Sequence, residues 1–336
     1  MSIDKIAIDF DSSYTTIYKL GSGVVLSEPT VAAVSADSKN QIKAVGYEAR
    51  KLIGKTAENT KIVFPVFEGE IVNEKVATKL ITAFLRKIDV KSSIFGVSAV
   101  VSVPCGAEPQ TYAKYKNVLK GAGVSKISFV EAPILSAIGQ RIPMTDSSPC
   151  FLIDMAGGTT NIAAVTLDGV IAGVSVNFGN NKIVTDIIDY IAEVHGLQVG
   201  ILTAERIKKE IGSAFVSSEV REFEVKGRNL AEGVPRSFTI SSNEVLEALT
   251  EPLNQVVGAV KKALEQTPPE LGADIAVRGL MLTGGGALLK DLDRLLMEET
   301  GLPVVVADDP LSCVVRGCGI ALEGIGKIED SIFCFG

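Results

Sequence analysis

Two stretches of the chain carry the same pattern of apolar and polar positions. The segments IAIDFDSSYTTIY, from Ile6, and FLIDMAGGTTNIAAV, from Phe151, each begin with an apolar strand that ends in aspartate. Each continues through a turn of small residues into a second, β-branched strand, which is the pattern of a β-hairpin. The two copies begin 145 residues apart. The repeat predicts a duplicated pair of α/β lobes.

Helical and strand-like patterns alternate between and after the two hairpins. Residues 74–87 place their apolar side chains at helical spacing on one face, and residues 98–103 form an apolar strand closed by Pro104. Ser241 and Glu244 have the spacing of a capping box and predict the start of a long helix.

Near the C-terminal end, residues 280–283 are expected to form a buried strand that leads into Gly284-Gly285-Gly286. A helix is predicted to follow over residues 287–299. No low-complexity linker interrupts the chain, so the two lobes are expected to be closely joined.

Composition and charge narrow the class of protein. The 336 residues favour two lobes over a single core, and 46% apolar with 22% charged residues is ordinary for a globular chain. The formal net charge is −7 and no basic stripe is present, so nucleic acid is not an expected partner. The start MSIDKIAIDF lacks the features of a secretory signal, which predicts a cytoplasmic protein.

Cysteine and histidine usage argues against zinc and against nucleophilic catalysis. The five cysteines form no C-x-x-C pair and are expected to be free thiols. The single histidine, His195, lies in a polar stretch near a predicted helix end, where a solvated surface role is expected rather than a catalytic one.

The two hairpin turns carry the candidate chemistry. Turns of small residues point successive backbone N–H groups inward and can bind phosphate oxygens, a role that suits Ser12-Ser13 and Gly157-Gly158-Thr159. Asp9 and Asp154 end the first strands and would face the phosphates, which is tolerable only with a cation between them. Magnesium, held largely through water, is the natural candidate.

A third loop adds to this pattern. Gly284-Gly285-Gly286 stands between a predicted strand and helix, where a ligand can lie against bare backbone. Each loop alone is weak evidence because Gly-rich segments are usually plain turns. The order hairpin, hairpin and triple glycine is a stronger indication of a nucleotide site.

At this point the chain resembles the superfamily of actin, Hsp70 and the sugar kinases, and within it the MreB family, from about residue 6 to residue 326. The most specific segments are GSGVVLSEPTVAAV, AVGYEARKLIGKTAENTKIVFPVFEGEI, TAERIKKEIGSA, TPPELGADI and LTGGGALLKDLDRLLMEETGLPVVVADDPLSCVVRG. The resemblance implies an α/β, actin-like fold. Two duplicated lobes, each with a mixed five-stranded sheet flanked by helices and a small subdomain, would enclose a nucleotide cleft.

The resemblance also implies boundaries. The first lobe is expected at residues 1–142, with its small subdomain at about 32–75. The second is expected at 143–314, with its small subdomain at about 181–240, and residues 315–336 are expected to return to the first lobe.

Ligand residues carry over from the family onto matching positions. Glu205 and Lys208 fall where the family contacts the nucleoside, although a solvated helix face is equally compatible with their spacing. The nucleotide is expected to be ATP with Mg²⁺. Residues that flank the three loops, Tyr14, Thr160 and Ala287, complete the candidate nucleotide-binding set.

The chain departs from the family pattern at the site. Asp11 stands where the first family loop has Gly, and Ala156 and Asn161 stand where the second has Gly and Glu. The family motif Glu-Glu-Pro is Glu131-Ala132-Pro133 here, so Ala132 replaces the glutamate that orients the attacking water. Thr159 is the one possible catalytic helper. Nucleotide binding is therefore expected to persist and to depend on the metal, with hydrolysis slow at most.

The function implied by the resemblance is a self-polymerising filament at the inner face of the cell membrane. Such a filament would determine cell shape by organising the wall-elongation machinery. Ile94-Phe95, in a polar turn before the strand at residues 98–103, is the expected membrane contact, since no apolar run is long enough to span. Two alternatives stay open: a paralogue that regulates another filament, and a small-metabolite kinase of the same superfamily. An Hsp70-type chaperone is disfavoured, since no segment for a peptide-binding domain follows the second lobe.

Overall fold

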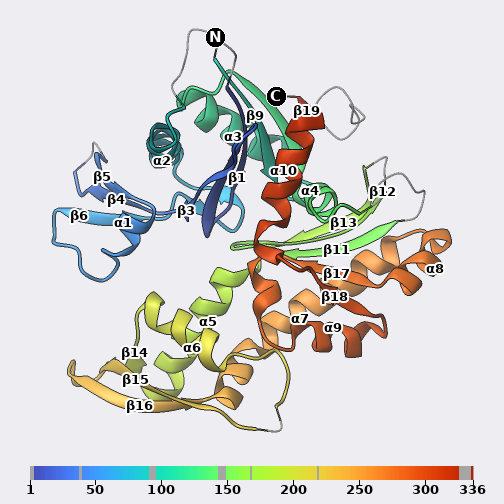
Figure 1. Cartoon of the computed structure of the whole chain (residues 1–336). Helices are drawn as coiled ribbons and strands as arrows, with labels where there is room; N and C mark the ends of the chain where they lie inside the picture. Colours follow the sequence, from blue (N-terminus) through green and yellow to red (C-terminus); the bar gives the residue numbers. More distant parts are fainter. Residues whose placement is uncertain are drawn as a thin grey trace.

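The chain folds into two α/β lobes, one above the other in Figure 1. The computed structural model describes residues 4–37, 40–90, 96–142, 149–166, 169–217, 219–324 and 334–335. Each lobe is built on one mixed β-sheet, and the two hairpins predicted from the sequence are the central strands of these sheets.

The first sheet has the strand order β19-β10-β9-β1-β2-β3. Its strands β1, β9 and β10 are parallel, while β2 and β3 run antiparallel to their neighbours. The short β19 pairs with the outer edge of β10. The strand bounds are β1 (Asp4–Phe10), β2 (Tyr14–Lys19), β3 (Gly23–Pro29), β9 (Val97–Val103), β10 (Lys126–Glu131) and β19 (Cys334–Phe335).

The second sheet repeats the topology of the first apart from β19, which has no counterpart among the described strands. Its order is β13-β12-β11-β17-β18, with β11, β17 and β18 parallel and β12 and β13 antiparallel. The duplicated lobes predicted from the hairpin repeat are confirmed. The strand bounds are β11 (Cys150–Met155), β12 (Thr160–Thr166), β13 (Gly169–Val176), β17 (Leu280–Thr283) and β18 (Val304–Val306).

Alternation of side chains along the strands places one core on each side of the first sheet. In β1, Ile6, Ile8 and Phe10 pack with the helices α2 and α3, while Ala7 faces the opposite way. The side with Ala7 packs on α4 and α10, and these helices also contact Leu152 of the second sheet. Helices α4 and α10 therefore lie between the two sheets and join the lobes.

The remaining helices cover the outer faces or belong to smaller elements. The helix bounds are α1 (Tyr47–Arg50), α2 (Glu74–Lys87), α3 (Pro109–Gly121), α4 (Ala132–Gly139), α5 (Asn180–His195), α6 (Ile201–Ile211), α7 (Ser242–Gln266), α8 (Pro269–Arg278), α9 (Leu292–Thr300) and α10 (Cys313–Gly324). Within the described ranges, no helix is both long and apolar enough to cross a membrane.

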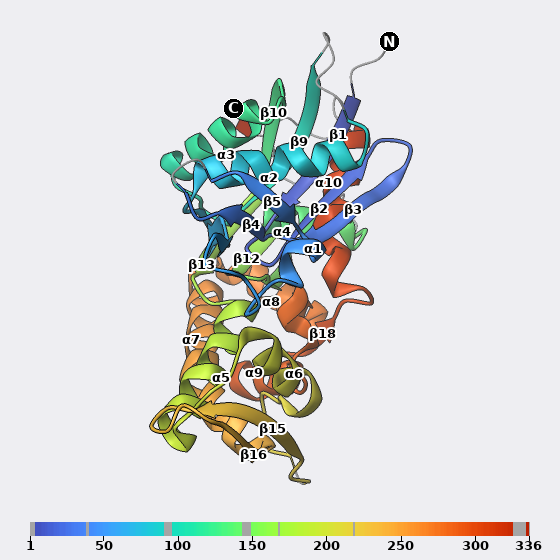
Figure 2. The ribbon, with the colours of Figure 1, turned by 90° about the vertical axis from the view of Figure 1, so that its left-hand side faces the viewer.

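Small sheets project from both lobes toward the same side of the molecule, which faces the viewer in Figure 2. One carries the order β5-β4-β6 beside α1, and the other carries β14-β15-β16 beside α6. A two-stranded ribbon, β7-β8, lies close to the cleft. Their bounds are β4 (Ala32–Ser35), β5 (Ile42–Val45), β6 (Thr60–Val63), β7 (Val66–Phe67), β8 (Glu70–Ile71), β14 (Leu197–Gln198), β15 (Glu222–Asn229) and β16 (Pro235–Ser241).

Local sequence signals predicted several elements to the residue. Helix α2 spans the predicted residues 74–87, β17 spans residues 280–283, and the Ser241–Glu244 capping box opens α7. The helix predicted for residues 287–299 is wrong in its first part. A 3₁₀ turn, η1 (Gly285–Leu288), begins at the second glycine, and α9 begins only after Asp291, whose φ is 61°. Lys290 forms an isolated parallel β-bridge with Ser213, and the extended backbone of such a bridge is incompatible with a helix at that residue.

The contact between α4 and α10 depends on two glycines and gives the first testable prediction. A Cβ on Gly317 would lie 1.8 Å from the carbonyl oxygen of Leu135, and one on Gly139 would lie 1.9 Å from that of Cys313. Gly317→Ala must push the two helices apart, so we expect it to lower the free energy of unfolding by about 2 kcal/mol. Chemical denaturation monitored by circular dichroism measures this difference.

A matched control lies in α7. A Cβ added to Gly258 has no atom within 4 Å, so Gly258→Ala should leave stability unchanged or raise it by up to about 1 kcal/mol through helix propensity. Equal stability of the two variants would contradict the close-packing argument.

Candidate functional site: a cleft between the two hairpins

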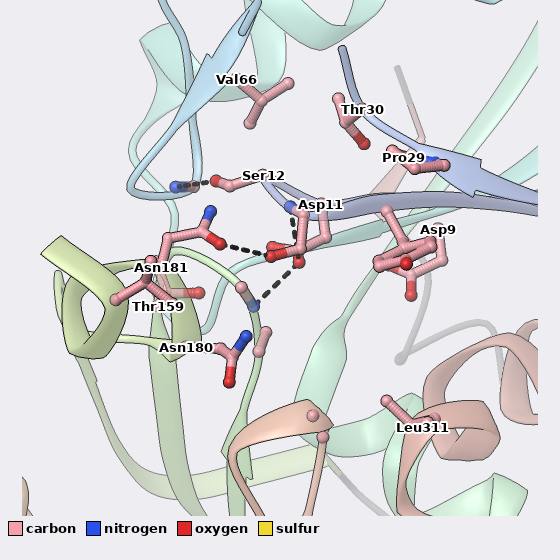
Figure 3. A pocket seen from close by; sticks show the side chains of 18 of the residues that line it. Asp9, Asp11, Ser12, Pro29, Thr30, Val66, Thr159, Asn180, Asn181 and Leu311 are labelled. Atoms are coloured by element: carbon pink, nitrogen blue, oxygen red, sulfur yellow. Dashed lines mark hydrogen bonds between the residues drawn. The ribbon is translucent and has the colours of Figure 1, made fainter. Parts of the chain in front are cut away.

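A cavity of about 940 Å³ lies between the lobes and is lined by the turns of both hairpins. Of the residues predicted from the sequence, it brings together Asp9, Ser12, Ser13, Tyr14, Ala132, Asp154, Gly157, Thr159, Glu205, Lys208, Gly284 and Gly285. Figure 3 shows this cavity from close by, with Asp9 and Asp11 on the first hairpin opposite Thr159 on the second. Five separate segments of the chain therefore meet at one site.

Four predicted residues do not line the cavity, and each has a packing role. Thr160 is fully buried and donates its hydroxyl hydrogen to the carbonyl oxygen of Phe178, 2.6 Å away. Gly158 lies against Ser12 and Glu68, where a Cβ would collide. Gly286 packs on Met155, and Ala287 is buried in the core of the second lobe. These four residues therefore hold the loops in place through packing and do not line the cavity.

Two aspartates at the strand ends sit in an environment that opposes their charge. Burial, the neighbouring charge of Asp11 and, more weakly, that of Asp154 raise the pKa of Asp9 to about 7, although a hydrogen bond from Ser102 Oγ at 2.6 Å favours the ionised form. Burial likewise raises the pKa of Asp154 to about 6, opposed by a hydrogen bond from Thr283 Oγ1 at 3.0 Å. A nearby cation would reverse both shifts.

The donor set fits a hard cation such as Mg²⁺. Asp154 is 1% exposed, and its Oδ2 atom has no hydrogen-bond partner within the described residues. A buried carboxylate oxygen without a partner is costly and commonly serves a ligand or ion. The described residues contain no cluster of three or more carboxylate, cysteine or histidine side chains that could enclose a metal ion.

Asp11 contacts the turn of the opposite hairpin. Its Oδ2 atom accepts a hydrogen bond from the backbone N–H of Gly157 at 2.8 Å and another from that of Ser13 at 3.2 Å (Figure 3). Beside it, Ser13 Oγ donates to Asn181 Oδ1 at 2.7 Å. The two turns are thus bonded to one another across the cleft.

The side chains that the resemblance assigns to the nucleoside, Glu205 and Lys208, line the cavity from α6. Glu205 forms a salt bridge with Arg50 of α1, and Arg50 also donates to the hydroxyl of Tyr14 at 3.1 Å. Lys208 Nζ donates to Asn180 Oδ1, and burial lowers the pKa of Lys208 to about 8. Neither Glu205 nor Lys208 therefore lies on a freely solvated helix face.

Sequence reasoning missed Arg50 and Asn181 as cleft residues. Nothing in the local pattern around Arg50 distinguishes it from a solvated arginine, because its partner Glu205 lies 155 positions further along the chain. Asn181 follows the start of α5, whose first amides bond to the carbonyls of the Gly157 turn. Only the strand topology shows that these residues face the hairpins.

Ala132 is the first residue of α4 and faces the cavity with a methyl group that cannot accept a hydrogen bond. Asn161 does not replace the missing acceptor. Its Oδ1 atom already accepts from the backbone N–H of Cys105 and from Ser175 Oγ, both at 3.0 Å, and its amide nitrogen donates to Thr159. The cavity therefore offers no free carboxylate at either position where the family has glutamate.

The predictions for His195, Ile94 and Phe95 remain. His195 does not line the cavity, and its side chain is less exposed than the predicted solvated surface role implies. Its side chain is 21% exposed and its Nε2 atom lies 2.7 Å from Glu244 Oε1 of the capping box. Ile94 and Phe95 lie outside the residues that the structure describes.

Two lobes whose sheets share one topology apart from β19, joined by a helix pair and enclosing a cavity between two aspartate-ended hairpins, define an actin-like fold. Solved structures of that fold are similar over nearly the whole chain. MreB5 of Spiroplasma citri, solved bound to AMPPNP and bound to ADP, matches with a TM-score of 0.90 and 29% identity, covering 97% of this chain and 98% of that one. The MamK double helical filament matches with a TM-score of 0.80 and 20% identity, covering 96% and 99%.

Sequence comparison then gives the family. The model of the family described as MreB/Mbl protein matches residues 3–330 of this chain. The cell shape-determining protein MreB of Escherichia coli (strain K12) is 46% identical over 337 aligned positions, covering 99% of this chain and 97% of that protein. The chain belongs to the MreB/Mbl family, and the recognition and fold predicted from the sequence are confirmed.

Proposed function

We propose that this protein is a nucleotide-dependent cytoskeletal filament protein that determines cell shape, binding ATP with Mg²⁺ in the cleft. The observation that carries the proposal is the convergence of both hairpin turns, the glycines after β17 and the α6 side chains on one cavity. Its volume of about 940 Å³ lies within the range of small-molecule and cofactor sites. Family membership and the AMPPNP- and ADP-bound relative support the same ligand class.

Each part of the cleft has a role in this proposal. The backbone amides of the two turns bind phosphate oxygens, and Gly285 lets the ligand approach the chain because a Cβ there would contact only Leu311. Glu205 and Lys208 bind the nucleoside. Asp9 and Asp154 hold Mg²⁺ through water. That cation neutralises phosphate charge and lowers the cost of burying both carboxylates.

Polymerisation and membrane contact complete the proposal. Members of this family are expected to assemble head to tail, through a heterologous contact that propagates because it does not close. We infer that the filament lies against the inner face of the cell membrane through Ile94 and Phe95, and that it organises the wall-elongation machinery. Two such side chains contribute roughly 2 kcal/mol each, which is little for one subunit and ample for a polymer that presents many copies.

Electron microscopy of the purified protein on anionic lipid tests the whole proposal. We expect filaments on the lipid with ATP and Mg²⁺ and few or none when EDTA replaces the metal. The double variant Ile94→Ser/Phe95→Ser should still assemble in solution and lose the lipid, as liposome flotation can measure. Monomers under every nucleotide and salt condition would overturn the filament proposal.

A regulatory paralogue is the second candidate, and the cavity itself favours it. Four side chains predicted to differ from the family, Asp11, Ala132, Ala156 and Asn161, line the cleft. A protein that binds nucleotide and joins another MreB filament without assembling alone would fit them. Co-sedimentation with that filament, together with monomers alone, would identify this role.

A further inference from the structure

The side chain of Asp11 occupies a position that a phosphate group needs. Its carboxylate receives hydrogen bonds from the backbone N–H of Gly157, in the turn of the second hairpin, and of Ser13, in its own turn. Figure 3 shows both bonds converging on the same oxygen. Backbone amides directed at one point form an anion site, and here an anion of the chain itself fills it.

The surrounding amides favour a charged occupant. Burial raises the pKa of Asp11, but the backbone amides of Ser12, Ser13, Gly157 and Gly158 act in the opposite direction by hydrogen bonding to the carboxylate. These donors come from the turns of both lobes. The carboxylate is therefore held by the same groups to which the proposed function assigns the phosphates of the nucleotide.

The contact also fixes the distance between the two turns. Asp11 bonds to Gly157, and the adjacent Ser13 bonds to Asn181 at the start of α5. A Cβ on Gly157 would lie 2.4 Å from Asp11 Oδ2 and 2.3 Å from Ser13 Oγ, so the turns approach as closely as glycine permits. A phosphate cannot enter between them while the carboxylate stays in place.

We propose that the Asp11 carboxylate competes with the nucleotide phosphates for the backbone amides of Gly157 and Ser13. The competition lowers the affinity for the phosphates and leaves the affinity for the nucleoside unchanged. This inference rests on the proposed nucleotide binding and adds a specificity determinant to it. A bound phosphate must displace the carboxylate from the Gly157 amide and then lie near its negative charge. A nucleoside without phosphate needs neither the Gly157 nor the Ser13 amide, so it can bind with the Asp11 contact intact.

The test compares wild type with Asp11→Asn and Asp11→Gly by isothermal titration calorimetry with adenosine, ADP and AMPPNP in Mg²⁺. Asparagine keeps the size and the hydrogen-bond acceptor but removes the charge, and glycine is the family residue. We expect both variants to bind ADP and AMPPNP roughly 10- to 100-fold more tightly than wild type, while adenosine affinity changes less than about twofold.

Glu68→Gln is the matched control. Glu68 is half-buried, lies beside Gly158 and does not line the cavity, so its substitution removes one negative charge near the same turn without touching the Gly157 amide. A change below about twofold for every ligand is expected. An equal gain in Glu68→Gln and Asp11→Asn would reduce the effect to general charge and overturn the competition.

The remaining outcomes separate the inference from the function on which it rests. If wild type and both Asp11 variants bind ADP and AMPPNP with equal affinity, the competition is refuted and nucleotide binding stands. If adenosine gains as much as ADP, Asp11 acts on closure of the lobes and not on phosphate. If neither wild type nor any variant binds a nucleotide, the proposed function itself fails. In a ¹⁵N-labelled sample, the Gly157 amide signal should move on Asp11→Asn and stay fixed in the Glu68→Gln control.

Discussion

Replacing Ala132 with glutamate is expected to raise the rate of ATP hydrolysis by about two orders of magnitude. Ala132 begins α4 at the wall of the cavity, where the family motif has the glutamate that orients the attacking water. An acceptor at this position restores the missing general base or water-positioning group. Phosphate release under single-turnover conditions, with protein in excess over ATP, measures the chemical step independently of nucleotide affinity.

The side chains near Ala132 that could orient a water are already engaged in other contacts. Asn161 has its carbonyl oxygen saturated by Cys105 and Ser175, and Asp9 is bonded to Ser102. Glu131, the residue before Ala132, accepts a hydrogen bond from the backbone N–H of Gly106 at 3.1 Å and does not line the cavity. The hydroxyl of Thr159 alone is a weak base.

Ala132→Leu is the control for this prediction, because leucine adds bulk at the same wall without an acceptor. It should leave hydrolysis at the wild-type rate or below. The prediction fails if leucine accelerates the reaction as glutamate does. It also fails if the wild type already hydrolyses ATP as fast as the glutamate variant.

The pocket differs from the family pattern by a redistribution of charge. One carboxylate, Asp11, is gained at the first turn, and two are lost where Asn161 and Ala132 stand. Asn161 lies close enough to Asp154 to lower the pKa of that carboxyl by hydrogen bonding, whereas a glutamate there would raise it by repulsion. We expect these changes to weaken the hydrolytic part of the site and to leave Asp9 and Asp154 free to hold a cation.

The sequence predicted elements whose signals are local. The two hairpins, α2 and the capping box of α7 each depend on residues close together in the sequence. Periodicity and cap chemistry are therefore enough to predict them. The error at residues 287–299 has the opposite origin. The apolar spacing there suits a helix, but the contacts of Lys290 and Asp291 with Ser213, 77 and 78 positions away, override it.

The site residues also divide into those with a local signal in the sequence and those placed by contacts between distant residues. The strand-end aspartates were predictable because a carboxylate after an apolar strand is visible in the sequence itself. The partners of Glu205 and Asp11 were not, since Arg50 and Gly157 reach them only after the lobes pack together. The sequence placed Asp11 where the first family loop has Gly. The structure adds that its carboxylate is bonded to the amides of the opposite turn.

The second large effect is expected from Asp154→Asn, which should change stability and metal-dependent binding in opposite directions. The pKa of Asp154 in the folded protein is about 6, above the ordinary value of 3.8. A raised carboxyl pKa means that the folded state binds the proton more tightly than the unfolded state. Its contribution to the free energy of unfolding therefore falls as pH rises from about 4 through about 6, and the full penalty is present at pH 8.

Asparagine carries no charge at any of these pH values, so the variant should show a flatter dependence of stability on pH without nucleotide. At pH 8 it should be more stable than wild type by about 2 kcal/mol, reduced to the extent that the buried amide lacks a partner. Thermal denaturation from pH 5 to pH 8 measures the slope. Asp274→Asn on the exposed face of α8 is the control and should follow the wild-type profile.

Binding should move the other way because the carboxylate that destabilises the fold is the one that holds the cation through water. Asp154→Asn is expected to lower the affinity for AMPPNP in Mg²⁺ by about 10- to 100-fold and to have little effect in EDTA. In the wild type, protonation of Asp154 and Asp9 below about pH 6 to 7 should weaken the same affinity while the unliganded fold becomes more stable. A variant that binds Mg²⁺ and AMPPNP as wild type does, at every pH, would show that Asp154 does not hold the cation. Its buried, unpartnered Oδ2 atom would then be a cost to the fold without a ligand to offset it.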